Sequence, residues 1–127
     1  MKISVQFLFA MHRYVIGLYR CMRILIERFP KILFEGCSAG GNRFDLGILS
    51  YFPQIWASDN TDALCRAEMQ TGYSYGYPMS TMGAHVSAGP NHQTLRNTPI
   101  ETRFNVAIFG IFGYECNLVL FIVEEVF

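Results

Sequence analysis

The stretch from Gln54 to Asp62 limits what this chain can fold into more than any other feature of the sequence. It begins as a short β-prone segment, Gln54 to Ala57, directly after Pro53, and it continues from Ser58 as a run of residue types that cap helices. A strand that ends in polar side chains and leads into a helix is where α/β proteins carry their chemistry. The sequence therefore predicts an α/β chain with a candidate site at residues 54–62.

Trp56 and the carboxylates Asp59 and Asp62 have two interpretations. An exposed Trp beside acids would suit a sugar, because an aromatic face packs on the C–H face of the ring while acids act on hydroxyl groups and on the glycosidic oxygen. Alternatively, Trp56 is buried at the end of a strand, and the two acids only stabilise the start of the next helix. These residues alone leave both interpretations open.

The rest of the chain alternates between expected helices and strands. The expected helices are His12 to Phe29, about Thr61 to Thr71, and about Thr98 to Phe109. The expected strands are Ile32 to Phe34, Gln54 to Ala57, Pro78 to Met82 and Gly113 to Leu118. The continuous apolar run Ile32 to Phe34 is expected to be buried on both sides, and Thr98 with Glu101 is expected to form a capping box. This alternation predicts a parallel sheet in one α/β domain.

Composition limits the class of protein further. The chain has 127 residues, 51% of them hydrophobic and 16% charged, with a formal net charge of zero, so it fits one domain or a piece of a larger α/β body. It lacks the basic excess of nucleic-acid-binding proteins. Met1 to Ala10 offers no clear signal-peptide cleavage site, and the apolar run Leu118 to Val123 is far too short to span a membrane. We therefore expect a cytoplasmic protein that binds neither nucleic acid nor a membrane.

Cysteine and histidine residues give little support to a metal or redox site. The four cysteines, Cys21, Cys37, Cys65 and Cys116, are far apart and form no Cys-x-x-Cys pair, which indicates reduced thiols in a non-secreted chain. His85 and His92 could join Cys37 around a metal, but they lack the spacing of known metal motifs. We expect no metal and no cofactor.

Gly36-Cys37-Ser38-Ala39-Gly40 matches the nucleophile elbow of serine hydrolases, and Asp59 followed by His85 or His92 keeps the hydrolase order. The elbow requires a helix immediately after the Ser. Gly40-Gly41-Asn42 follows here, which is poor helix sequence. A serine hydrolase that uses Ser38 is therefore a minor alternative.

Several segments together resemble bacterial α-galactosidases of glycoside hydrolase family 36. The resemblance runs from about His12 to Asn117 and rests on motifs in the family's order. These are His12 to Arg20, Ile32 to Asp45 with its Cys-Ser-x-Gly-Gly-x-Arg-Phe-Asp loop, Gln54 to Ala63, Met82 to Ser87 with Pro90 to Gln93, Thr98-Pro99 with Glu101 to Arg103, and Gly113-Tyr114-Glu115. Together these motifs are highly specific, although no single one would be.

The resemblance implies a (β/α)8 barrel that hydrolyses α-galactosides with retention, in which two carboxylates about 5–5.5 Å apart act as nucleophile and acid/base. It implies that Asp59 is the acid/base, which protonates the leaving oxygen and then deprotonates the attacking water. Cys37 and Gly40 match positions that line the galactose pocket, and Trp56 would be a wall of that pocket. Asp62 is expected to position a loop. The full-length parent is expected to be a homo-oligomer.

The chain also departs from the family. The family's nucleophile is an Asp in a Lys-Trp-Asp motif that ends the fourth strand, and neither Lys2 nor Lys31 begins such a motif. Ala39 and Asn42 stand where the family usually has Gly. Residues 1–11 do not match the family, and residues 118–127 form a divergent apolar tail. These departures predict a piece of the family's catalytic domain without its nucleophile.

The length supports a partial domain. A whole barrel takes about 250 residues, so residues 12–117 are expected to form roughly strands five to eight of the barrel with their helices. The expected function is an α-galactosidase fragment that is inactive alone. The alternative is a non-catalytic, truncated or degenerate product that at most binds sugar or a complementary half.

Overall fold

The computed structural model describes residues 5–119. Its helices are α1 (Val5–Arg28), α2 (Leu46–Leu49), α3 (Ala63–Ser74) and α4 (Ile100–Ala107), with a short 3₁₀ helix, η1 (Met79–Thr81). Its strands are β1 (Glu35–Gly36), β2 (Gln54–Trp56), β3 (Met82–Ser87) and β4 (Ile111–Glu115). They form one parallel sheet in the order β1-β2-β3-β4. The prediction of an α/β chain with parallel strands is confirmed.

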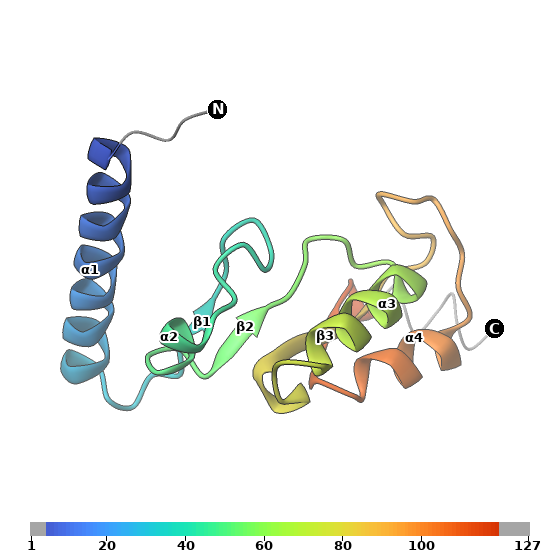
Figure 1. Ribbon diagram of the computed structural model, residues 1–127. Helices are drawn as coiled ribbons and strands as arrows, with labels where there is room; N and C mark the ends of the chain where they lie inside the picture. Colours follow the sequence, from blue (N-terminus) through green and yellow to red (C-terminus); the bar gives the residue numbers. More distant parts are fainter. Residues whose placement is uncertain (1–4, 120–127) are drawn as a thin grey trace.

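The side chains of β3 alternate between the two faces of the sheet. Met82, Ala84 and Val86 share one face and are completely buried. Helices α3 and α4 lie side by side over this part of the sheet (Figure 1). The opposite face carries Trp56, which pairs with Gly83 in the ladder, and His85 farther along β3. The helix-covered face is therefore the packing side, and the other face leads toward the candidate site.

The expected strand from Ile32 to Phe34 is wrong. These residues belong to no strand, and Ile32 and Leu33 are 55% and 70% exposed. The ladder between β1 and β2 begins with Glu35 opposite Gln54. One step earlier in this register, Phe34 would face Pro53, which has no backbone N–H to donate. The sheet therefore starts after Pro53, and the apolar run before β1 stays outside it.

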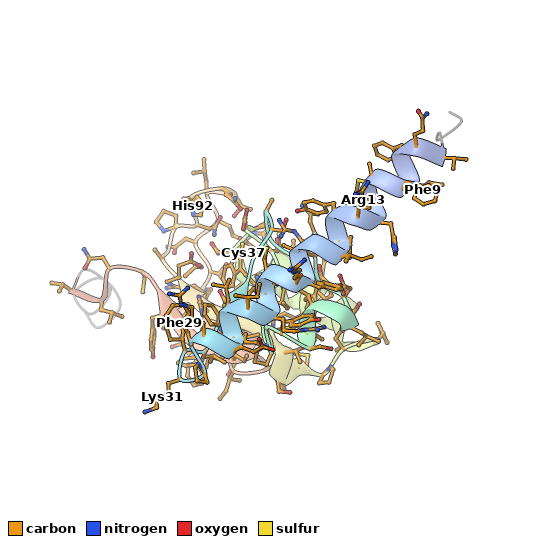
Figure 2. All side chains as sticks on the ribbon, turned by 90° about the vertical axis from the view of Figure 1, so that its left-hand side faces the viewer. Phe9, Arg13, Phe29, Lys31, Cys37 and His92 are labelled. Carbon is orange, nitrogen blue, oxygen red and sulfur yellow. The ribbon has the colours of Figure 1, made fainter. Side chains whose placement is uncertain are left out.

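Helix α1 is longer and less buried than the sequence indicates. It begins at Val5, so residues 5–11 are helical as well, and Met22 is its one buried residue. Figure 2 shows the half of α1 that carries Phe9 and Arg13 extending beyond the body of the molecule. The half of α1 from residue 17 to residue 28 meets the hydrophobic core. Leu18 and Tyr19 pack there against the core beside Met22.

That core joins α1 to the loops around β1 and β2. Its buried members are Met22, Phe44, Ile48, Ile55 and Met82. The Phe44 ring lies 4.6 Å from the Tyr73 ring and 4.5 Å from the Tyr77 ring, and Tyr77 Oη donates to the Phe44 carbonyl at 3.1 Å. These contacts fix the loop after β1 to the end of α3. The short helix α2 (Leu46–Leu49), which was not expected, begins here with Asp45 as its N-cap.

Other boundaries also differ from the expectation, among them the fourth strand, which runs from Ile111 to Glu115 instead of from Gly113 to Leu118. The third strand begins at Met82, because Pro78 starts a 3₁₀ turn in which Thr81 Oγ1 donates to the Pro78 carbonyl at 2.7 Å. The capping box of Thr98 and Glu101 is wrong, since the N-cap of α4 is Pro99 and no side chain caps it. The Thr98 carbonyl accepts instead from Arg103 Nε at 2.9 Å. The second strand and the existence of all three long helices are confirmed.

Candidate functional site

The loops after β1, β2 and β3 leave the same edge of the sheet, because parallel strands end on the same side. They comprise residues 37–45, 57–62 and 88–99, and Figure 1 shows all three at the top of the molecule. Parallel α/β proteins bind ligands at this edge. Cys37, Gly40 and Asp59 of the expected site all lie in these loops, and Trp56 ends β2 just below them.

Gly40 brings the first of these loops into direct contact with the second. Its φ is +74°, and a Cβ placed on it would lie 2.8 Å from Ser58 Cα and 3.1 Å from the Asp59 nitrogen. A Cβ placed on the neighbouring Gly41 would lie equally close to the Ala57 carbonyl oxygen, at 2.7 Å. Only glycine permits both the left-handed conformation and such an approach. The loop after β1 therefore rests on the backbone that carries Asp59.

The backbone around Asp59 forms two consecutive turns, each of which is closed by a side-chain oxygen that accepts from a backbone amide. The Asn60 amide donates to Ser58 Oγ at 3.1 Å, and the Asp62 amide donates to Asn60 Oδ1 at 3.0 Å. The Asp59 side chain is exposed, and within residues 5–119 its carboxylate accepts no hydrogen bond and pairs with no cation. Its backbone is thus held while its carboxylate stays open to a ligand at this edge.

Trp56 is buried, with 9% of its surface exposed, so of the two interpretations the structure confirms the buried Trp at the end of a strand. Its ring centroid is 4.7 Å from the Arg66 guanidinium carbon and 4.8 Å from the His85 ring centroid. The ladder between β2 and β3 ends at Trp56 and Gly83, and Arg66 bridges the strands there. It donates to the Ser58 carbonyl at 2.9 Å and to the Gly83 carbonyl. A cation–π contact and the packing on β3 therefore hold the indole inside.

Cys37 and Gly40 line a small cavity of about 100 Å³ beneath the loop after β1. Met22 from α1 and Ile48 from α2 contribute to its wall, whereas Asp59 and Trp56 do not. The structure thus brings Cys37 to Gly40 and Gly40 to Asp59, but it does not gather all four expected residues around one cavity. Cys37 itself is exposed.

The nucleophile-elbow interpretation of Ser38 is wrong. The Ser38 amide donates to the Gly40 carbonyl at 3.1 Å, and Ala39 has a φ of +48°. The chain therefore turns tightly after Ser38, and the next helix begins only at Leu46. Without a helix directly behind it, Ser38 lacks the support that an elbow gives its nucleophile.

Asp62 forms the strongest polar centre near the site. It caps α3 by accepting from the amides of Leu64 at 3.0 Å and Cys65 at 3.1 Å. Its carboxylate also accepts from Thr94 Oγ1 at 2.7 Å and pairs with Arg96 Nη1 at 2.7 Å. Burial alone would raise the pKa of Asp62, but these hydrogen bonds and the Arg96 charge outweigh it and lower the pKa below its usual value.

This arrangement predicts an acid-sensitive contribution to stability. Because the folded pKa of Asp62 lies below the unfolded value of about 3.9, its contribution is present above that pH and is lost as the pH falls through the folded pKa. We expect Asp62→Asn to lower the free energy of unfolding of the 127-residue chain by about 1–3 kcal/mol at neutral pH. The difference from the unsubstituted chain should shrink toward pH about 3, as urea unfolding at a series of pH values would reveal.

Glu68→Gln is the matched control, because Glu68 is an exposed carboxylate on α3. It removes one negative charge without removing the contacts of Asp62. A difference between Asp62→Asn and the unsubstituted chain that stayed constant from neutral to acid pH would contradict this prediction.

Three residues that the sequence did not single out also build this edge. Arg66 joins the loop after β2 to β3, and Thr94 and Arg96 reach Asp62 from the loop before α4. The Arg66 side chain is buried, which lowers the pKa of its guanidinium although the charge of Glu115 opposes the shift. An arginine in the first turn of a helix opposes the helix dipole, and this could have drawn attention to Arg66. Nothing in the local sequence marks Thr94 or Arg96.

The described residues contain neither a cluster of metal ligands nor a membrane-spanning helix. Between Val5 and Val119, no three His, Cys, Asp or Glu side chains lie close enough together to hold a metal ion. His92 is exposed in the loop before α4, and His85 packs on Trp56. In the same part of the chain, no helix is both long and apolar enough to cross a membrane.

Comparison with known proteins gives one consistent family. The model of the Melibiase family matches residues 4–125. "Alpha-galactosidase AgaA" of Geobacillus stearothermophilus is 58% identical over 107 residues, which cover 84% of this chain and 15% of that protein. "Bifunctional alpha-galactosidase/sucrose kinase AgaSK" of Mediterraneibacter gnavus is 57% identical over 112 residues, which cover 88% of this chain and 12% of that protein.

Solved structures agree with these sequence matches. The galactosidase domain of AgaSK superposes with a TM-score of 0.86 at 56% identity and covers 90% of this chain and 16% of that one. A variant of the family 36 α-galactosidase AgaA in complex with raffinose superposes with a TM-score of 0.83 at 56% identity, and the match covers 85% of this chain and 15% of that one. The chain therefore spans about 15% of the length of the relatives that it resembles.

Proposed function

The chain belongs to the Melibiase family of glycoside hydrolase family 36 α-galactosidases, and from this premise we propose that it forms part of the catalytic domain of a retaining α-galactosidase. In this proposal its four parallel strands are strands five to eight of a (β/α)8 barrel, and residues 12–117 are the matching half-domain. The proposed substrate class is the α-galactosides, since variants of AgaA were crystallised with raffinose and with stachyose.

Asp59 is the proposed acid/base. In the first step it donates its proton to the oxygen of the leaving group while the nucleophile, on a segment outside these 127 residues, forms a bond to the anomeric carbon. In the second step the Asp59 carboxylate takes a proton from water, and the water oxygen replaces the nucleophile. The position of Asp59 at the carboxyl edge of the sheet, with its carboxylate exposed, allows both transfers.

Cys37, Gly40 and Trp56 are proposed to border the galactose pocket. Gly40 would do so with its backbone, because the same loop crosses the Asp59 segment. Cys37 follows β1 and is exposed beside it. Trp56 would form the floor beneath these loops, since its ring is largely covered by Arg66 and His85. A cytoplasmic location and a homo-oligomeric parent stay predictions.

The observation that carries the proposal is the contact between Gly40 and the Ser58–Asp59 backbone. It joins two loops that are far apart in sequence at the edge where parallel α/β proteins bind ligands. The arrangement pairs a rigid glycine turn with an accessible carboxylate. The 56–58% identity to α-galactosidases covers most of the chain, and with it this contact supports a sugar-cleaving site more strongly than simple helix capping.

A chimera tests the proposal directly. In it, residues 12–117 replace the matching segment of G. stearothermophilus AgaA, which supplies the rest of the enzyme. We expect the folded chimera to hydrolyse raffinose, because the transplanted segment provides an acid/base in the correct place. A chimera with a cooperative thermal transition but no hydrolysis of raffinose would contradict the proposed function.

The 127-residue chain by itself is expected to release no galactose from 4-nitrophenyl α-galactoside. It has no Lys-Trp-Asp motif, and a retaining reaction needs both carboxylates. Release of nitrophenol measures the activity, and titration with galactose shows whether the chain still binds sugar. Hydrolysis that disappears in Asp59→Asn would contradict the expectation and would place a nucleophile within these residues.

A further inference from the structure

The loop from residue 88 to residue 99 holds the segment that follows Asp59. We propose that Thr94 and Arg96 of this loop are positioning residues for Asp59, and that they act through Asp62. This inference rests on the proposed role of Asp59 as acid/base, and it adds the loop that holds the Asp59 segment in place.

The loop contacts two successive residues beyond Asp59. Ser87, at the end of β3, donates from Oγ to the Thr61 carbonyl at 2.9 Å, and Asn91 Nδ2 donates to Thr61 Oγ1 at 3.0 Å. Thr94 and Arg96 then each donate to a different oxygen of Asp62, both at 2.7 Å. Thr61 and Asp62 are both buried. The loop therefore fastens this segment at three points and the end of β3 at a fourth, and the strongest are the charge-assisted contacts to Asp62.

Hydrogen bonds within the loop from residue 88 to residue 99 hold its own conformation. The Asn91 amide donates to the Arg96 carbonyl at 2.9 Å, and the Leu95 amide donates to the Asn91 carbonyl at 2.9 Å. Asn91 Oδ1 accepts from the amides of Gln93 at 2.9 Å and Thr94 at 3.0 Å. The buried Asn91 thus organises the loop and joins it to Thr61. Thr94 and Arg96 reach Asp62 from a preformed turn.

Asp62 transmits this restraint to Asp59 through the two turns between them. Its amide donates to Asn60 Oδ1, and the Asn60 amide donates to Ser58 Oγ. Gly40 limits movement on the other side, because the space between it and the Ser58 backbone is too small even for a Cβ atom. If the contacts of Asp62 are lost, the most accessible movement of Asp59 is away from the loop after β1. A displacement of about 1 Å can cost roughly 10²-fold in rate.

The test uses the AgaA chimera with Thr94→Val or Arg96→Met and two substrates. Raffinose has a poor leaving group that needs a proton from the acid, whereas the leaving group of 2,4-dinitrophenyl α-galactoside departs without one. We expect kcat/KM for raffinose to fall about 10–100-fold in either variant. For the dinitrophenyl substrate kcat/KM should stay nearly unchanged, because it reports the first bond cleavage only. Thr94→Ser, which keeps a hydroxyl donor, should restore raffinose hydrolysis.

Two control variants remove similar groups elsewhere. Thr71→Val removes an exposed hydroxyl that donates to the Ala67 carbonyl in α3, and Arg20→Met removes an exposed arginine of α1. Neither should change the ratio of the two kcat/KM values. Equal losses on both substrates in Thr94→Val and Arg96→Met, or no loss on either, would overturn the positioning role. Should Arg96→Met fail to fold, Thr94→Val, which removes a single hydroxyl, still decides.

The chimera with Asp59→Asn separates the proposed acid/base role of Asp59 from the positioning role of Thr94 and Arg96. Loss on raffinose alone supports the acid/base role, and the Thr94 and Arg96 variants then test positioning alone. Equal loss on both substrates in Asp59→Asn would refute the proposed function itself. The positioning role of Thr94 and Arg96 would then be refuted as well.

Discussion

Asp59→Asn in the AgaA chimera is expected to lower kcat/KM for raffinose by about 10²–10⁴-fold, the usual contribution of a general acid. Asparagine has the same shape and cannot donate the proton that the leaving oxygen requires. The fold should not change, because the Asp59 side chain is exposed and, within residues 5–119, it makes no hydrogen bond that the substitution removes. Initial rates of galactose release, with the melting temperature of each chimera, measure the effect.

Azide provides a second measurement on the same variant. With 2,4-dinitrophenyl α-galactoside the first step needs no acid, so a covalent galactosyl intermediate should accumulate. Azide can attack that intermediate without a general base, and we expect it to restore turnover with α-galactosyl azide as product. Glu68→Gln on α3 is the control, since it also replaces an exposed carboxylate by an amide. Unimpaired raffinose hydrolysis by Asp59→Asn would exclude Asp59 as the acid/base.

Gly40→Ala should damage both stability and activity. The left-handed backbone at φ +74° is unfavourable for alanine, and the added Cβ would lie 2.8 Å from Ser58 Cα. Backbone strain of this kind costs about 1–3 kcal/mol, and relief of the clash must move the loop after β1 or the Asp59 segment. In the chimera we therefore expect a lower melting temperature and a loss of roughly 10²-fold in kcat/KM for raffinose.

Gly72→Ala is a matched control for this substitution. Gly72 lies within α3, and a Cβ placed on it meets nothing within 4 Å. Alanine is a better helix former, so this variant should be more stable by about 0.5–1 kcal/mol and should keep full activity. A Gly40→Ala chimera with unchanged activity and stability would show that the contact between the two loops does not fix Asp59.

The sequence was most informative where local pattern and tertiary structure agree. The run of capping residues after Trp56 predicted the end of β2 and the start of α3, and Asp62 is indeed the N-cap. It was least informative about burial. Trp56 is covered by Arg66 and His85, which follow it by 10 and 29 residues, and no local pattern reports such contacts.

Pairing partners also decided where strands begin. Ile32 to Phe34 has the composition of a buried strand, yet the proline that would face Phe34 cannot donate to the ladder. Thr98 and Glu101 have the spacing of a capping box, but Arg103 binds the Thr98 carbonyl and α4 starts after Pro99. In both cases contacts with other residues, and not the local sequence preference, decided where the strand or the helix begins. The family resemblance named Asp59, whereas only the structure shows what surrounds it.

Within residues 5–119, each strand after β1 pairs with the strand that precedes it in the chain. Glu35 pairs with Gln54, Ile55 with Met82 and Gly83 with Ile111, so each ladder closes a segment of similar and modest length. The entropic cost of closing a segment grows only slowly with its length, so no single pairing step is much harder than another. The sheet can therefore form one strand at a time while the chain is being synthesised. At each stage the newest strand presents the edge on which the next one forms.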